Sequence, residues 1–324
     1  MINKGALCAG IAVVDSVVRP FVASPKMGTV ALVEEIGLYP GGNPVNTSID
    51  MARLGSPVAI AVAVGRDGMG KFLIDQLSLS GVDTRPMFVS NKFSTGASVA
   101  LVRHDGERGF IHTPGANKIF SDRHIPDTIL KRNKWLHLSG FFLMPALDGT
   151  PSSRCLMRAT KLGLTTSLDV CWDPSGKWRG IFGVLRHVDW FMPSYGEAVA
   201  IFKVKNPDQI AVEAFRLGVR RGIILKMGST GSRIYLADGT RGIVPPLKVK
   251  AVDATGAGDA YNAGFISASL RGLGPLDSAR YGSVTGALAV SGMGGAGNIR
   301  SWGQVRALAG RVRVVATSVK RVRV

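Results

Sequence analysis

The chain has 324 residues, of which 46% are hydrophobic and 19% charged, so a large core is available and wholesale disorder is excluded. The net charge of +18 is partly local, because residues 300–324 contain Arg and Lys but no Asp or Glu. Since no RNA-recognition or zinc-finger signature accompanies this charge, nucleic acid is not an expected partner. Cys8, Cys155 and Cys171 are too scattered for a disulfide framework or a zinc site, which fits a reducing cytoplasm.

The apolar runs are too short for a membrane protein. Val58–Val64 is far below the ~18 residues that a membrane-spanning helix needs. The N-terminal run Ala6–Val14 ends in Asp15 and has no clear small-residue cleavage site, unlike a signal peptide. We therefore interpret it as a buried first strand and expect no membrane association.

Short apolar runs alternate with longer amphipathic segments along the chain. The runs predicted to be buried strands are Ala6–Val14, Val58–Val64, Lys134–Leu138, Leu164–Leu168, Val188–Met192 and Gly222–Lys226. The segments predicted to be helices are Pro44–Leu54, Met69–Ser80, Pro151–Leu162, Tyr195–Phe202, Pro207–Leu217, Ala257–Leu270 and Leu276–Ser291. This alternation is typical of one doubly wound α/β domain, with a mostly parallel sheet and helices on both faces, over residues 1–324.

Two segments interrupt this alternation. Residues 17–38 and 92–111 show β-type patterns with no helix between strands, and Asp105-Gly106 is a turn signal that predicts a hairpin. We expect these insertions to pair into a small, discontinuous β lid over the main sheet. Residues 311–324 are rich in Val and Arg, and are interpreted as a final strand or a loose basic tail.

The strongest local signal is the run Asp253-Ala-Thr-Gly-Ala-Gly-Asp259 at the start of a predicted helix. Gly256, Ala257 and Gly258 leave backbone N–H groups uncovered at the positive end of the helix dipole, which makes an anion site. A carboxylate beside such a site can act as a general base, which accepts the proton of a hydroxyl group as that group attacks a phosphorus atom. From the spacing alone, an ordinary acidic residue in the first helical turn explains Asp259 equally well.

A second glycine cluster, Gly41-Gly-Asn-Pro-Val-Asn46, opens the first predicted helix, which Gly55 ends. Asn43 is a good N-cap residue and would start this helix. Capping does not explain the Gly41-Gly42 pair or Asn46. Paired glycines let a ligand approach the backbone, and the Asn46 amide offers a donor and an acceptor to a sugar hydroxyl.

Together the two clusters resemble the signatures of the ribokinase-like (PfkB) family of carbohydrate kinases, and the resemblance covers nearly the whole chain. Supporting motifs occur in the family's order: Gly10–Asp15, Val64–Gly70, Gly81–Thr84, Leu136–Gly140, Leu168–Asp169, Pro193–Glu197, Lys226–Gly231 and Gly295–Ala296. The resemblance implies a doubly wound α/β domain with a β lid. It also implies transfer of the γ-phosphate of ATP to a sugar hydroxymethyl group.

The resemblance further implies roles for single residues. Asp259 would be the catalytic base, and the backbone at Gly256, Ala257 and Gly258 would hold the transferred phosphate. The implied sugar-binding residues are Asp15, Gly41, Gly42 and Asn46. The implied nucleotide-binding residues are Lys226, Gly228, Ser229, Gly231 and Ser194.

The resemblance implies metal ions as well. Mg²⁺ would bridge the ATP phosphates, with Glu197 reaching it through water. Asp253 and Thr255 match positions that hold a monovalent cation in some members, so K⁺ is a second expected ion. Ser194 stands where the family usually has Asn, and Ala254 where Thr is common.

We therefore expect an ATP-dependent sugar kinase, closer to fructokinase-like than to ribokinase-like members in its Gly-Asn-Pro-Val-Asn motif. Its partners would be a small-molecule sugar and ATP, with a homodimer forming through the lid in the cytoplasm. Two alternatives stay open: a nucleoside kinase of the same family, and a catalytically weak nucleotide- or sugar-sensing protein.

Overall fold

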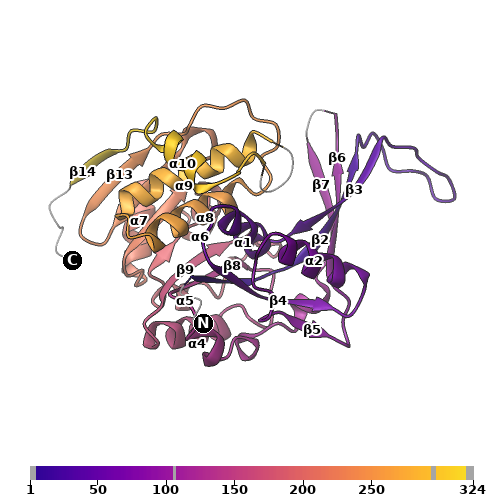
Figure 1. Ribbon diagram of the computed structural model, residues 1–324, viewed down its shortest axis with the longest axis horizontal. Coiled ribbons are helices and arrows are strands. Elements are labelled where there is room, and N and C mark those ends of the chain that lie inside the picture. Colours follow the sequence, from indigo (N-terminus) through magenta and orange to yellow (C-terminus); the bar gives the residue numbers. More distant parts are fainter. Residues whose placement is uncertain (1–4, 105–106, 293–296, 319–324) are drawn as a thin grey trace.

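A mostly parallel β-sheet forms the centre of the structure, and a smaller sheet stands beside it (Figure 1). The computed structural model describes residues 5–104, 107–292 and 297–318. In this part of the chain the main sheet contains β1 (Ala6–Gly10), β4 (Val58–Gly65), β5 (Phe88–Ser90), β8 (Trp135–Phe141), β9 (Thr165–Val170), β10 (Trp190–Phe191), β11 (Gly222–Lys226), β12 (Ser232–Leu236), β13 (Thr240–Val244) and β14 (Val315–Ser318). Their order is β14-β13-β12-β11-β10-β9-β8-β1-β4-β5.

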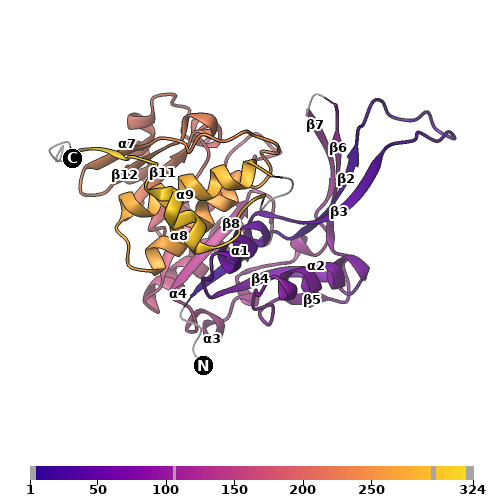
Figure 2. The same cartoon turned by 45° about the horizontal axis from the view of Figure 1, so that its top comes forward.

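Helices cover both faces of this sheet. One layer contains α1 (Asn43–Arg53), α2 (Gly68–Leu79), α8 (Ala257–Leu270), α9 (Pro275–Val290) and α10 (Trp302–Ala309). The other contains α3 (Asp127–Leu130), α4 (Thr150–Lys161), α5 (Phe182–Leu185), α6 (Tyr195–Phe202) and α7 (Pro207–Arg216). Figure 2 shows α1, α8 and α9 packed together on one face. The predicted fold class is confirmed.

The central strands are apolar throughout because each face of the sheet has its own core. In β1, Leu7 and Ala9 belong to one core, and Ala6 and Cys8 belong to the other. Because both faces of a central parallel strand are buried, its sequence is a continuous apolar run and does not alternate between apolar and polar residues. The seven predicted helices agree with α1, α2, α4, α6, α7, α8 and α9 to within one residue at each end.

The prediction of a single strand over Ala6–Val14 is wrong. β1 ends at Gly10, and the chain then leaves the main sheet and enters the small sheet as β2 (Val13–Arg19). Gly10 has φ +147°, and a Cβ at this position would lie 1.9 Å from the backbone oxygen of Ser139. A residue without a side chain is therefore required where the chain crosses from one sheet to the other.

The small sheet, which we call the lid, contains β2, β3 (Glu35–Gly41), β6 (Gly96–Val102) and β7 (Arg108–Thr113), in the order β3-β2-β6-β7. Its strands come from two distant segments, as predicted, and it projects away from the α/β body (Figure 1). β6 and β7 form the predicted hairpin, although its expected turn, Asp105-Gly106, lies outside the described residues. Residues 20–34 contain no strand.

One edge of the main sheet is antiparallel, and the sequence did not predict its strands β12 and β13. β14 pairs with β13, so residues 315–318 of the basic C-terminal segment form an edge strand, while residues 319–324 lie outside the described part of the chain. Helix α10 was not predicted either. No helix among the described residues combines the length and apolar character needed to cross a membrane.

Candidate active site

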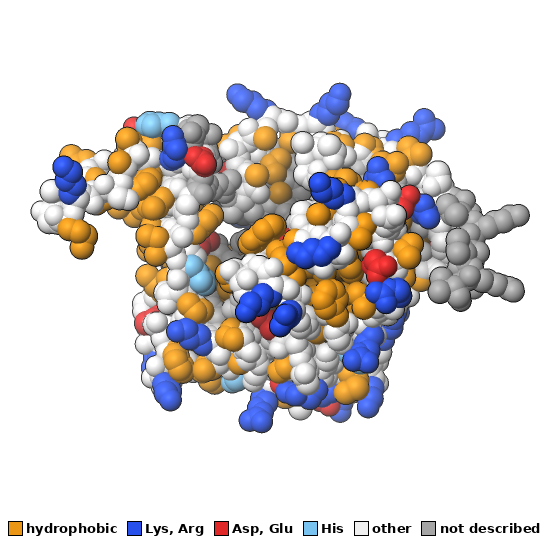
Figure 3. Space-filling view, turned by 180° about the vertical axis from the view of Figure 1, so that it is seen from behind, with side chains coloured by type: hydrophobic (Ala, Val, Ile, Leu, Met, Phe, Trp, Pro, Cys, Tyr) orange, Lys and Arg blue, Asp and Glu red, His pale blue; other side chains and the backbone are white. Residues whose placement is uncertain are grey.

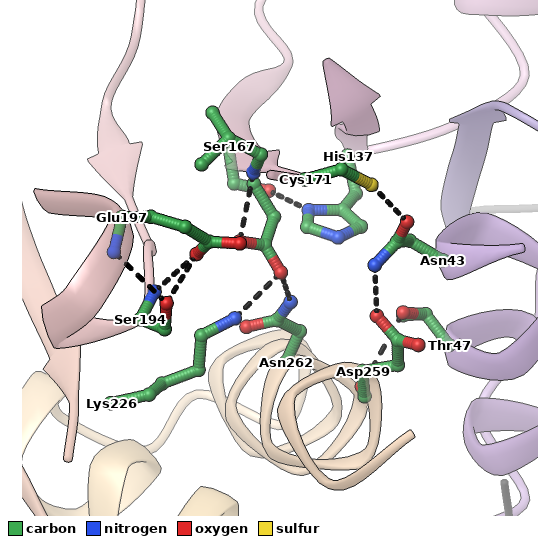
Figure 4. A network of polar contacts seen from close by, with 12 residues as sticks. Asn43, Thr47, His137, Ser167, Cys171, Ser194, Glu197, Lys226, Asp259 and Asn262 are labelled. Atoms are coloured by element: carbon green, nitrogen blue, oxygen red, sulfur yellow. Dashed lines mark hydrogen bonds and ion pairs between the residues drawn. The ribbon is translucent and has the colours of Figure 1, made fainter. Parts of the chain in front are cut away.

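Asp259 lies in the first turn of α8, directly after the glycine-rich run. Gly256 is the N-cap of this helix and has the left-handed φ of 72°, which a glycine adopts without strain. Asp259 is only 5% exposed, and Figure 4 shows it facing α1. The predicted anion site and the predicted base are thus held together at the positive end of one helix.

Two amides from α1 bind the carboxylate of Asp259. Nδ2 of Asn43 donates to Oδ1, and Nδ2 of Asn46 donates to Oδ2, each at 2.9 Å. The Thr47 hydroxyl donates to the backbone oxygen of Asp259 at 3.3 Å. The thiol of Cys171 donates to Oδ1 of Asn43 at 2.9 Å, which orients the amide so that its NH₂ faces the carboxylate.

The expectation that Asn43 caps α1 is wrong. The N-cap is Gly42, which has φ 100° and makes no side-chain capping bond, and Asn43 is already inside the helix. Asn43 lies three residues before Asn46, so both side chains lie on the same face of α1 and reach Asp259 together. The C-terminal end is as predicted, because Gly55 adopts φ 66° just after the helix.

The environment of Asp259 makes it a stronger base than an exposed aspartate. Burial raises its pKa from 3.8 to about 7, and the negative charge of Asp169 adds to this, while the two amides and Lys226 oppose it. A carboxyl group with a pKa near neutrality is matched to general-base chemistry at physiological pH.

Asp15 lies in β2, on the lid. A Cβ on Gly41 would lie 2.1 Å from Oδ2 of Asp15, so this glycine makes room for the carboxylate. Burial raises the pKa of Asp15, and a hydrogen bond from Ser98 opposes the rise. Ser98 also pairs with Nδ1 of His112 at 3.1 Å, which links Asp15 to a histidine on β7.

Gly42 completes the connection between the lid and α1. A Cβ at Gly42 would meet the backbone oxygen of Ile11 at 2.4 Å. The implied sugar-binding residues Asp15, Gly41, Gly42 and Asn46 therefore lie close together, from β2 on the lid to the first turn of α1. Figure 3 shows the molecular surface hollowed between the lid and the body.

A second polar cluster lies on the other side of α8, where two strands of the main sheet end (Figure 4). Nζ of Lys226, at the end of β11, binds Oδ2 of Asp169, at the end of β9, at 2.6 Å. Nδ2 of Asn262 on α8 donates to the same oxygen. The carboxyl ends of parallel strands and the N-terminus of α8 thus meet, which is where ligands bind in open α/β sheets.

Ser194 and Glu197 form a capping box at the start of α6. The Ser194 backbone N–H and hydroxyl donate to Oε2 of Glu197 at 2.8 and 2.6 Å, and the Glu197 N–H donates back at 3.3 Å. Burial raises the pKa of Glu197, and the nearby Asp169 charge raises it further. The backbones of Ser194 and Lys226 also pair in an isolated parallel β-bridge. The capping box therefore lies next to the second polar cluster.

A cavity of about 700 Å³ opens beside the anion site. Lys226, Gly228, Ser229 and Gly231 line it, as implied for nucleotide binding, and Ala257 and Gly258 line it as well. Much of the remaining wall is apolar: Pro246, Leu247, Val249, Ala251, Ala287 and Val290. An apolar pocket beside a backbone anion site suits a nucleotide, whose base has flat, apolar ring faces and whose phosphates are charged. Ser194 is not part of this lining.

Asp253 and Thr255 shape the loop before α8. The backbone N–H and hydroxyl of Thr255 donate to Oδ1 of Asp253 at 2.9 and 2.7 Å. Among the residues that the structure describes, no group of three or more His, Cys, Asp or Glu side chains could hold a metal ion. The match Gly295-Ala296 lies outside the described residues.

Sequence reasoning missed several residues of the site. The contact between Asn43 and Asp259 was detectable in part, because helical periodicity puts Asn43 on the face of Asn46. Asn262 lies three residues after Asp259 and therefore also near the first turn of α8. The links of Asn262 to Asp169 and of His112 to Asp15 carry no local signal, because their partners are distant in the chain.

Comparison with known proteins identifies the family of this chain. The family model described as "pfkB family carbohydrate kinase" matches residues 9–302. Probable fructokinase-7 from Arabidopsis thaliana is 26% identical over 277 residues, which cover 81% of this chain and 77% of the relative. The 5-dehydro-2-deoxygluconokinase of Clostridium beijerinckii is 25% identical over 270 residues, which cover 78% of each chain. A solved structure of ribokinase II from E. coli with ATP and Mg²⁺ is 25% identical, with a TM-score of 0.79, over 95% of this chain and 99% of that chain.

Proposed function

This chain belongs to the pfkB family of carbohydrate kinases and is a phosphotransferase with an alcohol group as acceptor, and we propose that it transfers the γ-phosphate of ATP to a sugar hydroxymethyl group with Asp259 as the base. One observation carries this proposal. The buried carboxylate of Asp259 is bound by amides of α1 on the lid side, while the preceding residue, Gly258, lines the large cavity. An acceptor at the lid and a nucleotide in the cavity would therefore meet at Asp259.

The reaction follows from these positions. Asp259 accepts the proton of the sugar hydroxyl as its oxygen attacks the γ-phosphorus, and the bond from phosphorus to the β,γ-bridging oxygen breaks to release ADP. The backbone N–H groups of Gly256 and Gly258 stabilise the charge on the transferred phosphoryl oxygens. The N–H of Ala257, which donates to the backbone oxygen of Ala254 at 3.4 Å in this structure, joins them when phosphate is bound. Asn43 and Asn46 keep the carboxylate oriented, and Asp15 holds the sugar.

Glu197 fits a magnesium ion that is held through water. Its carboxylate offers the hard oxygens that Mg²⁺ prefers. The negative charge of Asp169, which contributes to the raised pKa of Glu197, makes the surroundings of Glu197 more favourable for a cation. When bound, Mg²⁺ supplies neutralising charge to the ATP phosphates. We also propose, on the family resemblance, that K⁺ binds near Asp253 and Thr255 and increases activity.

The sugar is proposed to be of the fructokinase or ribokinase type, which the names of the relatives support. A coupled assay of ADP release over fructose, ribose, 5-dehydro-2-deoxygluconate and a set of nucleosides tests this. Release with sugars alone supports the proposal, and release with nucleosides alone would replace it by a nucleoside kinase. Binding of ATP and sugar without release would indicate a sensing protein.

We further propose that two copies associate through the lid. Strand register puts Asp15 and Ser98 on one face of the lid. Ile36, Leu38 and Ile111 lie on the other face and are 66%, 53% and 65% exposed, which leaves an apolar surface to be covered. A variant with Lys at positions 36 and 38 should be monomeric in light scattering if wild type is a dimer through this face. A wild-type monomer at all concentrations would contradict the proposal.

The proposed localisation is the cytoplasm. Cys8 and Cys155 are buried free thiols, and Cys171 is free as well. Thiols persist in a reducing compartment, where ATP is also available. Fractionation of cells that produce the protein would test this, with recovery in the cytosolic fraction as the expected result.

A further inference from the structure

The ammonium group of Lys226 lies at the anion site itself. A Cβ built on Gly258 would be 3.2 Å from Nζ of Lys226, which is the nearest atom outside the chain neighbours of Gly258 and the adjoining backbone of α8. Gly258 is one of the residues whose backbone N–H groups form the anion site. A cation and a set of N–H donors therefore converge at the N-terminus of α8.

Asp169 holds Lys226 in this place, and Asn262 in turn holds Asp169. Oδ2 of Asp169 accepts from Nζ of Lys226 at 2.6 Å and also from Nδ2 of Asn262. Asp169 comes from β9, Lys226 from β11 and Asn262 from α8, so the arrangement depends on the main sheet and the helix together. Figure 4 shows Lys226 and Asn262 side by side. The side chains of Lys226 and Asp169 are only 12% and 2% exposed.

The buried lysine remains charged. Burial favours its neutral form, but the charges of Asp169 and Glu197 outweigh this effect and raise the pKa of Lys226. A charge that is shielded from water acts more strongly on a neighbouring anion than one at the surface. An ammonium group also has three N–H donors, and Asp169 uses one of them in the contact at 2.6 Å.

Given the kinase function proposed above, we propose that Lys226 is a catalytic residue whose ammonium group binds the transferred phosphate at the anion site, and that Asp169 and Asn262 position it. In phosphoryl transfer, negative charge spreads over the oxygens of the transferred group, and a preorganised cation stabilises it. The absence of a side chain at Gly258 lets the ammonium group and the backbone donors face the same phosphate.

The first test is the substitution Lys226→Met, with Lys71→Met as the matched control. Lys71 pairs with Asp75 at the same 2.6 Å, but it is 77% exposed and lies on α2, away from the site. Lys226→Met should lower kcat by about 10²–10³-fold, the range for losing one preorganised donor. Lys71→Met should stay within about threefold of wild type. Lys226→Arg, which keeps the charge, should recover part of the lost activity.

Binding measurements by calorimetry separate a phosphate contact from general loss of the nucleotide site. Lys226→Met should weaken the binding of ATP about tenfold or more, as expected for one charged hydrogen bond, and leave the binding of AMP unchanged. Equal loss for ATP and AMP, or no loss for either, would overturn the proposal. This comparison needs no acceptor sugar, so it tests Lys226 even if wild type releases no ADP with any sugar, a result that would refute the proposed function instead.

A double variant excludes a purely structural ion pair. Lys226→Met leaves Asp169 buried without its cation, which by itself destabilises a protein. The variant Lys226→Met/Asp169→Asn removes both charges and should restore folding. If the pair is only structural, activity returns with stability and the proposal is wrong. If Lys226 binds phosphate, activity stays low, and the ATP–AMP comparison can be repeated on this variant.

The positioning role of Asp169 has its own readout. Asp169→Asn leaves the ammonium group free to approach the phosphates but no longer holds it in place. We expect kcat to fall about tenfold or more without any loss of ATP affinity. A parallel loss of kcat and ATP affinity would mean that Asp169 supports the nucleotide site as a whole rather than the position of Lys226.

Discussion

Nδ2 of Asn46 donates to Oδ2 of Asp259 at 2.9 Å, although 213 residues separate the two in the chain. This contact joins the two glycine-rich motifs, since Asn46 follows the Gly41-Gly42 pair and Asp259 follows Gly258. It also connects the proposed acceptor side of the site to the proposed nucleotide side. The chemistry proposed for this protein depends on that connection.

The substitution Asp259→Asn tests the base directly. Asparagine keeps the size of the side chain but cannot accept the proton of the attacking hydroxyl, so kcat should fall by about 10²–10⁴-fold. Affinities for ATP and sugar, measured by calorimetry, should stay near those of wild type. A kcat within about threefold of wild type would exclude Asp259 as the base.

The same substitution should change the pH dependence of stability. The folded-state pKa of about 7 lies above the ordinary 3.8, so between these values the folded state of wild type binds more protons than the unfolded state. The contribution of Asp259 to the free energy of unfolding is therefore present at low pH and is lost as the pH rises toward 7. In urea unfolding, Asp259→Asn should gain stability relative to wild type between pH 5 and pH 8, by a few kcal/mol at most. A constant difference over this interval would contradict the raised pKa.

The amide of Asn43 should set the acid limb of the pH–rate profile. Activity needs the ionised carboxylate, so kcat/KM should rise with pH through about 7. Hydrogen bonds to the carboxylate stabilise its ionised form and lower the pKa, so Asn43→Ala should move this limb to higher pH. Thr47→Val, which removes a bond only to the backbone oxygen of Asp259, is the matched control and should leave the limb in place. A shift to lower pH in Asn43→Ala would refute the assignment.

Asp15 should act on the acceptor and not on the nucleotide. Asp15→Ala removes a charged hydrogen-bond partner worth ~1.5–3 kcal/mol, so KM for the accepted sugar should rise about tenfold or more. KM for ATP should change little, because Asp15 lies on the lid and the nucleotide cavity is lined by other elements. Equal increases in both constants would indicate loss of structure.

The C-terminal segment should be dispensable for chemistry but not for solubility. A chain that ends at Gly310 lacks β14, which pairs only with β13 at the edge of the described sheet, far in sequence from the site residues. Sugar-dependent ADP release should be retained. The unpaired edge of β13 should promote aggregation, measurable by light scattering on heating. A soluble, folded truncation without activity would show that the segment contributes to the site.

Much of the architecture follows from local sequence patterns. The helices around Asn46 and Asp259 were located to within a residue, because hydrophobic periodicity and terminal glycines depend only on near neighbours. The glycine-rich runs also predicted both halves of the proposed site. The edge strands β12 and β13 were missed, since short antiparallel strands that are partly exposed lack a continuous apolar run.

The sequence by itself determined the order and type of the central elements, the two-segment origin of the lid and the residue types at the proposed phosphate and acceptor sites. Only the tertiary structure decided which residues are in contact. It shows that Asn43 binds Asp259 rather than capping α1, and that β1 ends at Gly10. It also shows that Lys226 lies next to Gly258, where it forms an ion pair with Asp169. Periodicity and capping are properties of neighbouring residues. The partner of a buried amide, carboxylate or ammonium group depends instead on how distant segments pack. A buried polar group is stable only when it is hydrogen-bonded, and the packing of these segments decides which donor or acceptor lies next to it.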